Sequence, residues 1–273
     1  MDISAAVESL AGPWFLPAAV FVFGLLIGSF LNVCIWRLPA EEQVVRGRSH
    51  CRSCGAQIAW YDNIPLVSFA ALKGRCRHCG TRISWLYPAV ELATALLLLA
   101  VFCRFGWTAK GFIYGILTAA MVVLTVIDAR EMILPDEITI PGLIIGLILS
   151  FLVPSLHGQT GFLAGGLQGI YGVAAGGGLL WIVGTVGSWI FKKEAMGGGD
   201  VKMMAMVGAF IGWEKVLLVN FILAPVVGAV VGIVLKLRFK KELIPYGPFL
   251  SLGTLAAIFY GNQLIDWYIG LFF

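Results

Sequence analysis

Charged residues are scarce in this chain. Lys, Arg, Asp and Glu together make up 12% of its 273 residues, against roughly a quarter in a soluble globular protein. Hydrophobic residues make up 59%, and the mean hydropathy is +0.92. So few charges cannot cover a water-exposed surface, which excludes an ordinary soluble domain and predicts a protein built for lipid.

The sequence also lacks the signals of a cleaved signal peptide and of a nucleotide-binding turn. No Lys or Arg precedes the first apolar run, so we do not expect a cleaved signal peptide. No strand precedes the glycine-rich stretch at 165–178, so these glycines do not predict a nucleotide-binding turn. We expect the pairs Gly165/Gly169 and Gly172/Gly176 to let helix backbones approach closely.

Apolar runs long enough to span a bilayer require about 20 residues each. Candidates lie near 14–36, 88–104, 111–127, 137–153, 163–191, 216–236 and 248–272, with a shorter eighth at 201–213. The sequence therefore predicts an all-α polytopic membrane protein of about eight transmembrane helices. Its expected parts are a first span (1–36), a soluble insert (37–87) and a multi-helix membrane domain (88–273).

The positions of the cations predict the orientation. With eight spans and the N-terminus outside, every Lys and Arg except Arg104, Lys110 and Lys215 falls on one side. Cytoplasmic loops carry an excess of Lys and Arg, so we place the insert 37–87 in the cytoplasm. The net charge of +4 follows from this bias and gives no sign of a nucleic-acid partner.

The insert contains a repeated cysteine motif. CRSCGAQIAW, which starts at residue 51, matches CRHCGTRISW, which starts at residue 76. The two CxxC pairs supply four thiolates, Cys51, Cys54, Cys76 and Cys79, which suit a tetrahedral zinc ion. A segment this short buries little core, and a structural metal is a usual remedy. We predict a zinc-ribbon-like module with a structural Zn²⁺.

Disulfides and redox catalysis are the alternatives for these cysteines. The predicted cytoplasmic location disfavours disulfides, and a redox CxxC would require a thioredoxin-like βαβ setting. His50 and His78 adjoin the cysteines and offer alternative ligands, although four thiolates already close the coordination shell.

Acidic residues at the ends of membrane spans are costly and require an explanation. Asp128 closes the third predicted span, and Asp200 opens the short segment 201–213 after three glycines. Two adjacent carboxyl groups share a proton, and this is the basis of aspartic-protease catalysis. The glycines would let a peptide backbone approach Asp200.

Solvated interface residues are the alternative interpretation of such acids. Asp136, after Pro135, is most simply a helix N-cap. We interpret Glu91 as a first-turn residue of the second span that favours the helix dipole. Asp128 lies at a helix C-terminal end, where the dipole disfavours a carboxylate, so this interpretation is weaker for it.

Several motifs in order resemble one family, the bifunctional type IV prepilin peptidases/N-methyltransferases, which are membrane aspartic proteases with a GxGD motif. The matching motifs are GSFLNVCIWRLP (28–39), the paired CxxC around NIPLVSF (63–69), YPAVEL (87–92), D-x6-PD from Asp128, GGGD ending at Asp200, and PYGPFL (245–250).

The resemblance implies Asp128 and Asp200 as the catalytic pair. It implies cleavage of the short cationic leader of a prepilin or pseudopilin on the cytoplasmic side of the bacterial inner membrane. It also implies N-methylation of the new terminus by S-adenosylmethionine, with the cysteine module serving methylation; the methyl-donor site is not located. Alternatives are a GxGD protease without methyltransferase activity and a zinc-stabilised adaptor or transporter.

Two hypotheses concern substrate access. The acidic residues of 128–137, including Glu131 and Glu137, would receive the cationic leader. The shortness of 201–213 suggests that Asp200 is recessed in a hydrated notch, from which Lys202 would snorkel outward. The sequence does not indicate the oligomeric state.

Overall fold

The computed structural model describes residues 12–45, 47–193, 196–239 and 244–271. Within these residues the chain is helical, and β-type pairing is limited to two isolated bridges. The chain divides into two compact units, residues 1–123 and 124–273.

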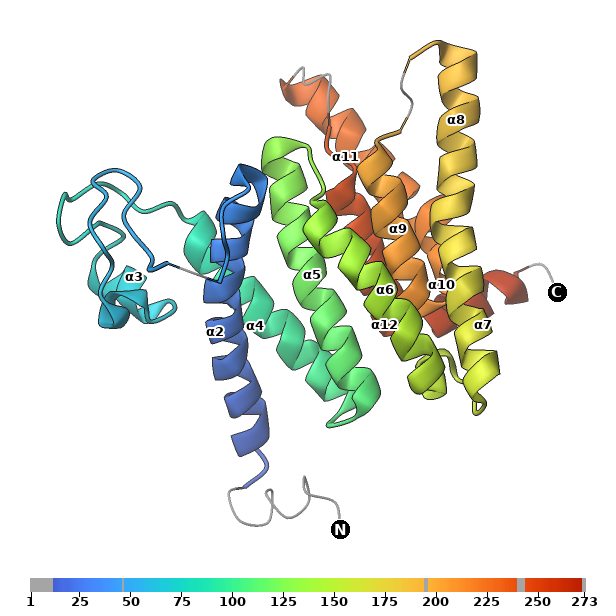
Figure 1. Ribbon diagram of the computed structural model, residues 1–273, viewed down its shortest axis with the longest axis horizontal. Coiled ribbons are helices and arrows are strands. Elements are labelled where there is room, and N and C mark those ends of the chain that lie inside the picture. Colours follow the sequence, from blue (N-terminus) through green and yellow to red (C-terminus); the bar gives the residue numbers. More distant parts are fainter. Residues whose placement is uncertain (1–11, 46, 194–195, 240–243, 272–273) are drawn as a thin grey trace. The chain divides into compact units, whose positions relative to one another are not determined.

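The first unit contains two long helices that pack along each other, α2 (Phe15–Arg37) and α4 (Leu86–Phe105) (Figure 1). Gly24 and Gly28 of α2 make this packing close, since a Cβ at either would lie within 2.7 Å of the α4 backbone. Asn32 of α2 donates a hydrogen bond to the carbonyl of Tyr87 at 3.1 Å.

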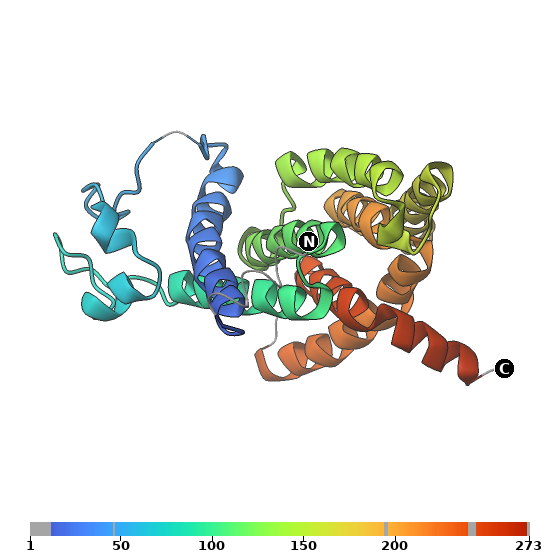
Figure 2. The ribbon, with the colours of Figure 1, turned by 90° about the horizontal axis from the view of Figure 1, so that it is seen from below.

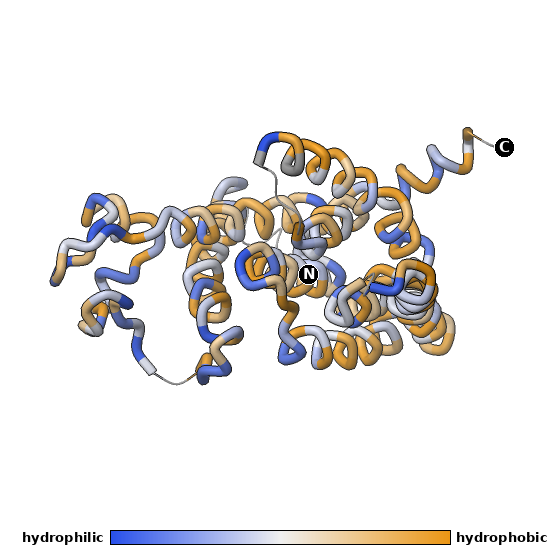
Figure 3. The backbone as a smooth tube through the Cα atoms, turned by 90° about the horizontal axis from the view of Figure 1, so that it is seen from above, coloured by the Kyte–Doolittle hydropathy of each residue, from blue (hydrophilic) through white to orange (hydrophobic). Residues whose placement is uncertain are grey.

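Between these helices the chain forms the cysteine module, which contains short elements only. These are η1 (Leu38–Ala40), η2 (Trp60–Asn63) and α3 (Val67–Ala71). Coloured by hydropathy, the module is mixed in character, while long apolar stretches follow the helices (Figure 3). Helix α5 (Ala109–Glu131) begins in the first unit and ends in the second.

The second unit is a helical bundle. After α5 its elements are α6 (Asp136–Leu152), η3 (Pro154–His157), α7 (Phe162–Val173), η4 (Ala174–Gly178), α8 (Leu179–Phe191), α9 (Gly198–Ile211), α10 (Trp213–Leu218), η5 (Val219–Leu223), α11 (Ala224–Phe239) and α12 (Gly247–Gly270). The segments η4 and η5 are π-helical turns inside longer helices.

Helix α9 lies in the centre of this unit. Its residues 203–211 are all buried, and it packs against α6, α7, α8 and α12 (Figure 2). Gly172 of α7 lies against the backbone of Gly208, and Gly176 lies against that of Met204. The prediction that these glycines serve close helix packing is confirmed.

Among the residues that the structure describes, five helices are long and apolar enough to cross a membrane. They are Phe15–Ala40, Leu86–Phe105, Ala109–Glu131, Phe162–Phe191 and Trp213–Val234. Helices α6, α9 and α12 occupy the other three predicted spans but do not belong to this set. The polytopic helical class is confirmed, whereas the count of eight stays a prediction.

Candidate active site and metal centre

Asp128 lies in the last turn of α5 and is only 6% exposed. Its Oδ2 accepts a hydrogen bond from the backbone N–H of Gly247, the first residue of α12, at 2.8 Å. A helix N-terminus presents unpaired N–H groups to a carboxylate. The start of α12 therefore holds the orientation of this carboxyl group.

The close contact with Asp128 requires a glycine at position 247. A Cβ at this position would lie 2.7 Å from Oδ2 of Asp128 and 3.0 Å from its Cγ. PYGPFL is recognisable in the sequence as a motif, but the sequence alone assigns no role to Gly247 or Tyr246.

Asp200 lies in the first turn of α9 and belongs to the same site. Burial, and then the charge on Asp128, raises the pKa of the Asp200 carboxyl to about 7. Burial and then the charge on Asp200 also raise the pKa of Tyr246, which precedes Gly247. The structure thus brings Asp128 and Asp200 together, with the N-terminus of α12 beside both.

The three glycines before Asp200 have different surroundings. A Cβ on Gly199 would lie 3.0 Å from Cβ of Leu134, so this glycine allows the loop after α5 to pack against α9. Gly198 is exposed and would meet nothing within 4 Å. Gly197 is the glycine beside the carboxyl group, since a Cβ there would lie 3.4 Å from Asp200 Oδ2. Gly198 thus borders open space, whereas Gly199 serves packing.

Asp136 does not cap a helix as expected. Helix α6 begins at Asp136 itself, and its N-cap is Pro135, with no side-chain capping bond. The Asp136 carboxylate instead accepts hydrogen bonds from Nζ of Lys202, which lies 2.8 Å from both oxygens. The N-cap interpretation was wrong because the side chain is held by a residue of another helix.

Each CxxC motif forms the same turn. The N–H of Cys51 donates to Ala56 O at 2.8 Å, and the N–H of Cys76 donates to Thr81 O at 2.9 Å. The bridges His50–Gln57 and Arg75–Arg82 close the two turns at the same relative positions. Gly55 and Gly80 have φ of +71° and +69°, a conformation that glycine adopts without steric cost. The sequence repeat is therefore a structural repeat.

The two turns bring four sulfur atoms together. The Sγ atoms of Cys51, Cys54, Cys76 and Cys79 all lie within 4.8 Å of one another, and Cys51 Sγ is 3.9 Å from Cys79 Sγ. A tetrahedral zinc ion with Zn–S distances of about 2.3 Å separates its sulfurs by about 3.8 Å. The four cysteines could therefore hold a metal ion. Among the described residues this group includes neither His50 nor His78.

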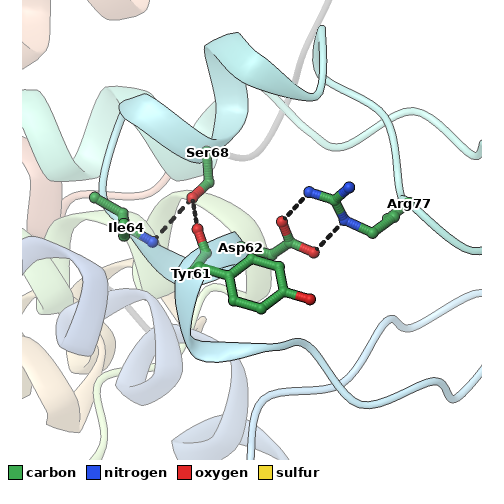
Figure 4. A network of polar contacts seen from close by, with 5 residues as sticks. All are labelled: Tyr61, Asp62, Ile64, Ser68 and Arg77. Carbon is green, nitrogen blue, oxygen red and sulfur yellow. Dashed lines mark hydrogen bonds and ion pairs between the residues drawn. The ribbon is translucent and has the colours of Figure 1, made fainter.

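A polar network ties the second cysteine turn to the segment 61–68 (Figure 4). Arg77, between Cys76 and Cys79, donates to both Asp62 oxygens at 2.6 and 2.7 Å, which holds the pKa of Asp62 below its usual value. The Ser68 hydroxyl accepts from Ile64 N–H at 3.0 Å and donates to Tyr61 O at 2.8 Å.

Glu91 has a specific partner in place of the expected general effect on the helix dipole. It lies beyond the first turn of α4 and is 8% exposed. Its Oε2 accepts a hydrogen bond from the N–H of Leu66 at 2.9 Å. Leu66 has φ +59°, which is strained for a branched side chain. This hydrogen bond attaches the segment that follows η2 to helix α4.

Known proteins match both parts of the chain. Residues 22–105 match the sequence family described as the bacterial peptidase A24 N-terminal domain. Residues 115–233 match the type IV leader peptidase family. The prepilin leader peptidase/N-methyltransferase of Aeromonas hydrophila is 37% identical, and the match covers 94% of this chain and 95% of that protein. The chain belongs to the type IV leader peptidase family.

Two further members have the same name. The Pseudomonas aeruginosa (strain PAO1) protein is 36% identical, with 91% of each chain covered. The Myxococcus xanthus protein is 43% identical, and the match covers 83% of this chain. This chain spans 64% of the length of that relative. No solved structure matches the chain.

Proposed function

We propose that this member of the family is a membrane aspartic endopeptidase that removes the leader from type IV prepilins or pseudopilins and N-methylates the new N-terminal residue. The supporting observation is the convergence of Asp128 and Asp200, which lie 72 positions apart in the chain, on the N-terminus of α12. Relatives that align along nearly the whole chain have both activities in their names.

The two carboxyl groups divide the proton transfers of hydrolysis. With a pKa of about 7, Asp200 retains a proton at neutral pH in a large share of molecules. Asp128 then accepts a proton from water as the water oxygen attacks the scissile carbonyl carbon. Asp200 donates its proton to the leaving amide nitrogen as the C–N bond breaks. The N-terminus of α12 keeps the Asp128 carboxylate oriented throughout.

The cysteine module is proposed to carry Zn²⁺ and to serve methyl transfer. Cys51, Cys54, Cys76 and Cys79 would complete a tetrahedral shell, which leaves no open position and suits a structural ion. S-adenosylmethionine would supply the methyl group that moves to the amine nitrogen released by cleavage. The loops of the module are held in place by hydrogen bonds, among them those of Arg77 with Asp62 and of Leu66 with Glu91 on α4.

The proposed setting is the bacterial inner membrane, with eight spans. Helix α9 has 14 residues, or about 21 Å at a rise of 1.5 Å per residue, and would be enclosed by its neighbours. The cysteine module and the aspartates would face the cytoplasm, as the distribution of Lys and Arg predicts.

Asparagine substitutions test the catalytic pair. Asp128→Asn or Asp200→Asn, co-expressed with a prepilin, should each abolish the mobility shift that cleavage produces on a gel. Asp266→Asn, which alters an exposed aspartate of α12, is the matched control and should leave processing intact. Processing that survives either of the first two substitutions would falsify the assignment.

Serine substitutions test the cysteine module separately. Cys51→Ser or Cys76→Ser should lower the bound zinc measured by elemental analysis and reduce methylation, read from the N-terminal mass of the pilin. Cleavage should continue. Cys103→Ser, at an exposed cysteine outside the cluster, serves as the control. Full methylation by a metal-free variant would contradict the proposal.

A further inference from the structure

An ion pair lies beside the proposed catalytic pair. Lys202 Nζ is 2.8 Å from both oxygens of Asp136, and the two side chains are 48% and 51% exposed. The pair joins the first turn of α6 to the second turn of α9. Lys202 lies two residues after Asp200 on the same helix, where such side chains point to different sides, so the pair flanks the proposed active site.

The loop before Asp136 is part of the same surface. Leu134 packs against Gly199, which fixes the loop next to Asp200. The two residues before it, Met132 and Ile133, are 52% and 46% exposed although both are apolar. An exposed apolar loop and an adjacent carboxylate suit a peptide that combines basic and apolar residues.

The pair is poorly explained as a stabilising contact. Exposed ion pairs contribute little to stability because water and salt screen them. A weak, exposed pair of this kind is readily exchanged for another ion pair.

We propose that Asp136 binds one basic residue of the leader, and that Lys202 occupies this carboxylate until the substrate replaces it. The pair is then a specificity determinant that favours basic over neutral leaders, and it takes no part in bond breaking. This inference rests on the proposed peptidase function and adds the residue that recognises the charge of the substrate.

The test compares the two members of the pair. One substrate is a prepilin with a basic leader, and the other is the same prepilin with every leader Lys and Arg replaced by Gln. For the basic leader, Asp136→Asn should raise KM by about three- to fivefold, the effect of one exposed ion pair. Lys202→Gln should lower KM by about twofold, because the competing cation is gone. Neither variant should change kcat or the KM for the neutral leader.

A purely structural bridge predicts a different result. Both substitutions would then break the same contact, and both would impair cleavage of basic and neutral leaders alike. Effects of the same sign on KM from the two variants would overturn the proposal. Asp128→Asn tests the proposed function independently, since it should stop cleavage of both substrates whatever Asp136 does.

Two controls distinguish a direct contact between Asp136 and the leader from a general electrostatic effect. Lys193→Gln removes the same charge from an exposed turn after α8 and should leave KM unchanged. Single Lys/Arg→Gln changes along the leader should identify one position at which Asp136→Asn no longer has an effect. Equal dependence on every basic leader residue would show that no specific pair forms.

Discussion

Gly247→Ala tests whether the N-terminus of α12 orients the carboxylate of Asp128, the proposed catalytic base. The glycine does not have a positive φ, so alanine is compatible with the backbone, and the effect should come from the added methyl group alone. That methyl carbon would lie 2.7 Å from Asp128 Oδ2, whereas ordinary contact begins at 3.4 Å. The carboxylate oxygen must therefore move by about 0.7 Å, the difference between these two distances.

A shift of this size lengthens the 2.8 Å hydrogen bond from Gly247 N–H to about 3.5 Å, beyond useful hydrogen-bond length. Misplacement of a catalytic group by about 1 Å costs up to a hundredfold in rate. We expect kcat to fall by about ten- to a hundredfold, or about 1.4–2.7 kcal/mol of transition-state stabilisation. KM should change less, because Gly247 is buried.

The measurement is the initial rate of prepilin cleavage by purified enzyme in detergent, with thermal unfolding recorded on the same samples. Gly270→Ala is the matched control, since a Cβ at that position of α12 meets nothing within 4 Å. If Gly247→Ala cleaved within twofold of the parent rate while unfolding at the same temperature, the idea that α12 positions Asp128 would be wrong.

Two further predictions concern the ionisation of Asp200 and the attachment of the cysteine module. Cleavage should be fastest at or below neutral pH and should decline above pH 7 by about tenfold per unit, because the raised pKa of about 7 means that Asp200 loses its acidic proton there; a flat profile of kcat/KM from pH 6 to 9 would contradict this role. Glu91→Ala removes the acceptor of the Leu66 N–H and should destabilise the segment 63–68 by about 1–3 kcal/mol. Limited proteolysis should then cut this segment faster, Glu91→Gln should restore part of the protection, and an unchanged digestion rate would argue against the attachment.

The cysteine module was predictable because its structure is local. Each turn is closed within eight residues, and the same hydrogen bonds recur in both copies, so the spacing of Cys and Gly already determines the geometry. The sequence could not predict how the module is held. The contact between Glu91 and Leu66 joins residues 25 positions apart and depends on a strained turn that no composition signal marks.

The candidate active site was partly predictable for a related reason. Acidic residues at the ends of apolar segments are rare enough to be noticed one at a time, and the order of motifs paired Asp128 with Asp200. Their partners are ordinary residues in other helices. Gly247 contacts Asp128 across 119 positions, and Lys202 contacts Asp136 across 66. Such pairs follow from how the helices pack, which a single sequence does not reveal.

The number of spans illustrates a physical limit of hydropathy. An apolar segment of 10–14 residues can be a helix enclosed by protein as well as part of a membrane span. Helix α9 is apolar because residues 203–211 are all buried against other helices, so its hydropathy reflects protein contacts. The position of Asp200 at the start of this enclosed helix has a chemical consequence. Neighbouring helices exclude water from one side of the carboxyl group, and this burial is the main cause of the raised pKa that suits it to act as an acid.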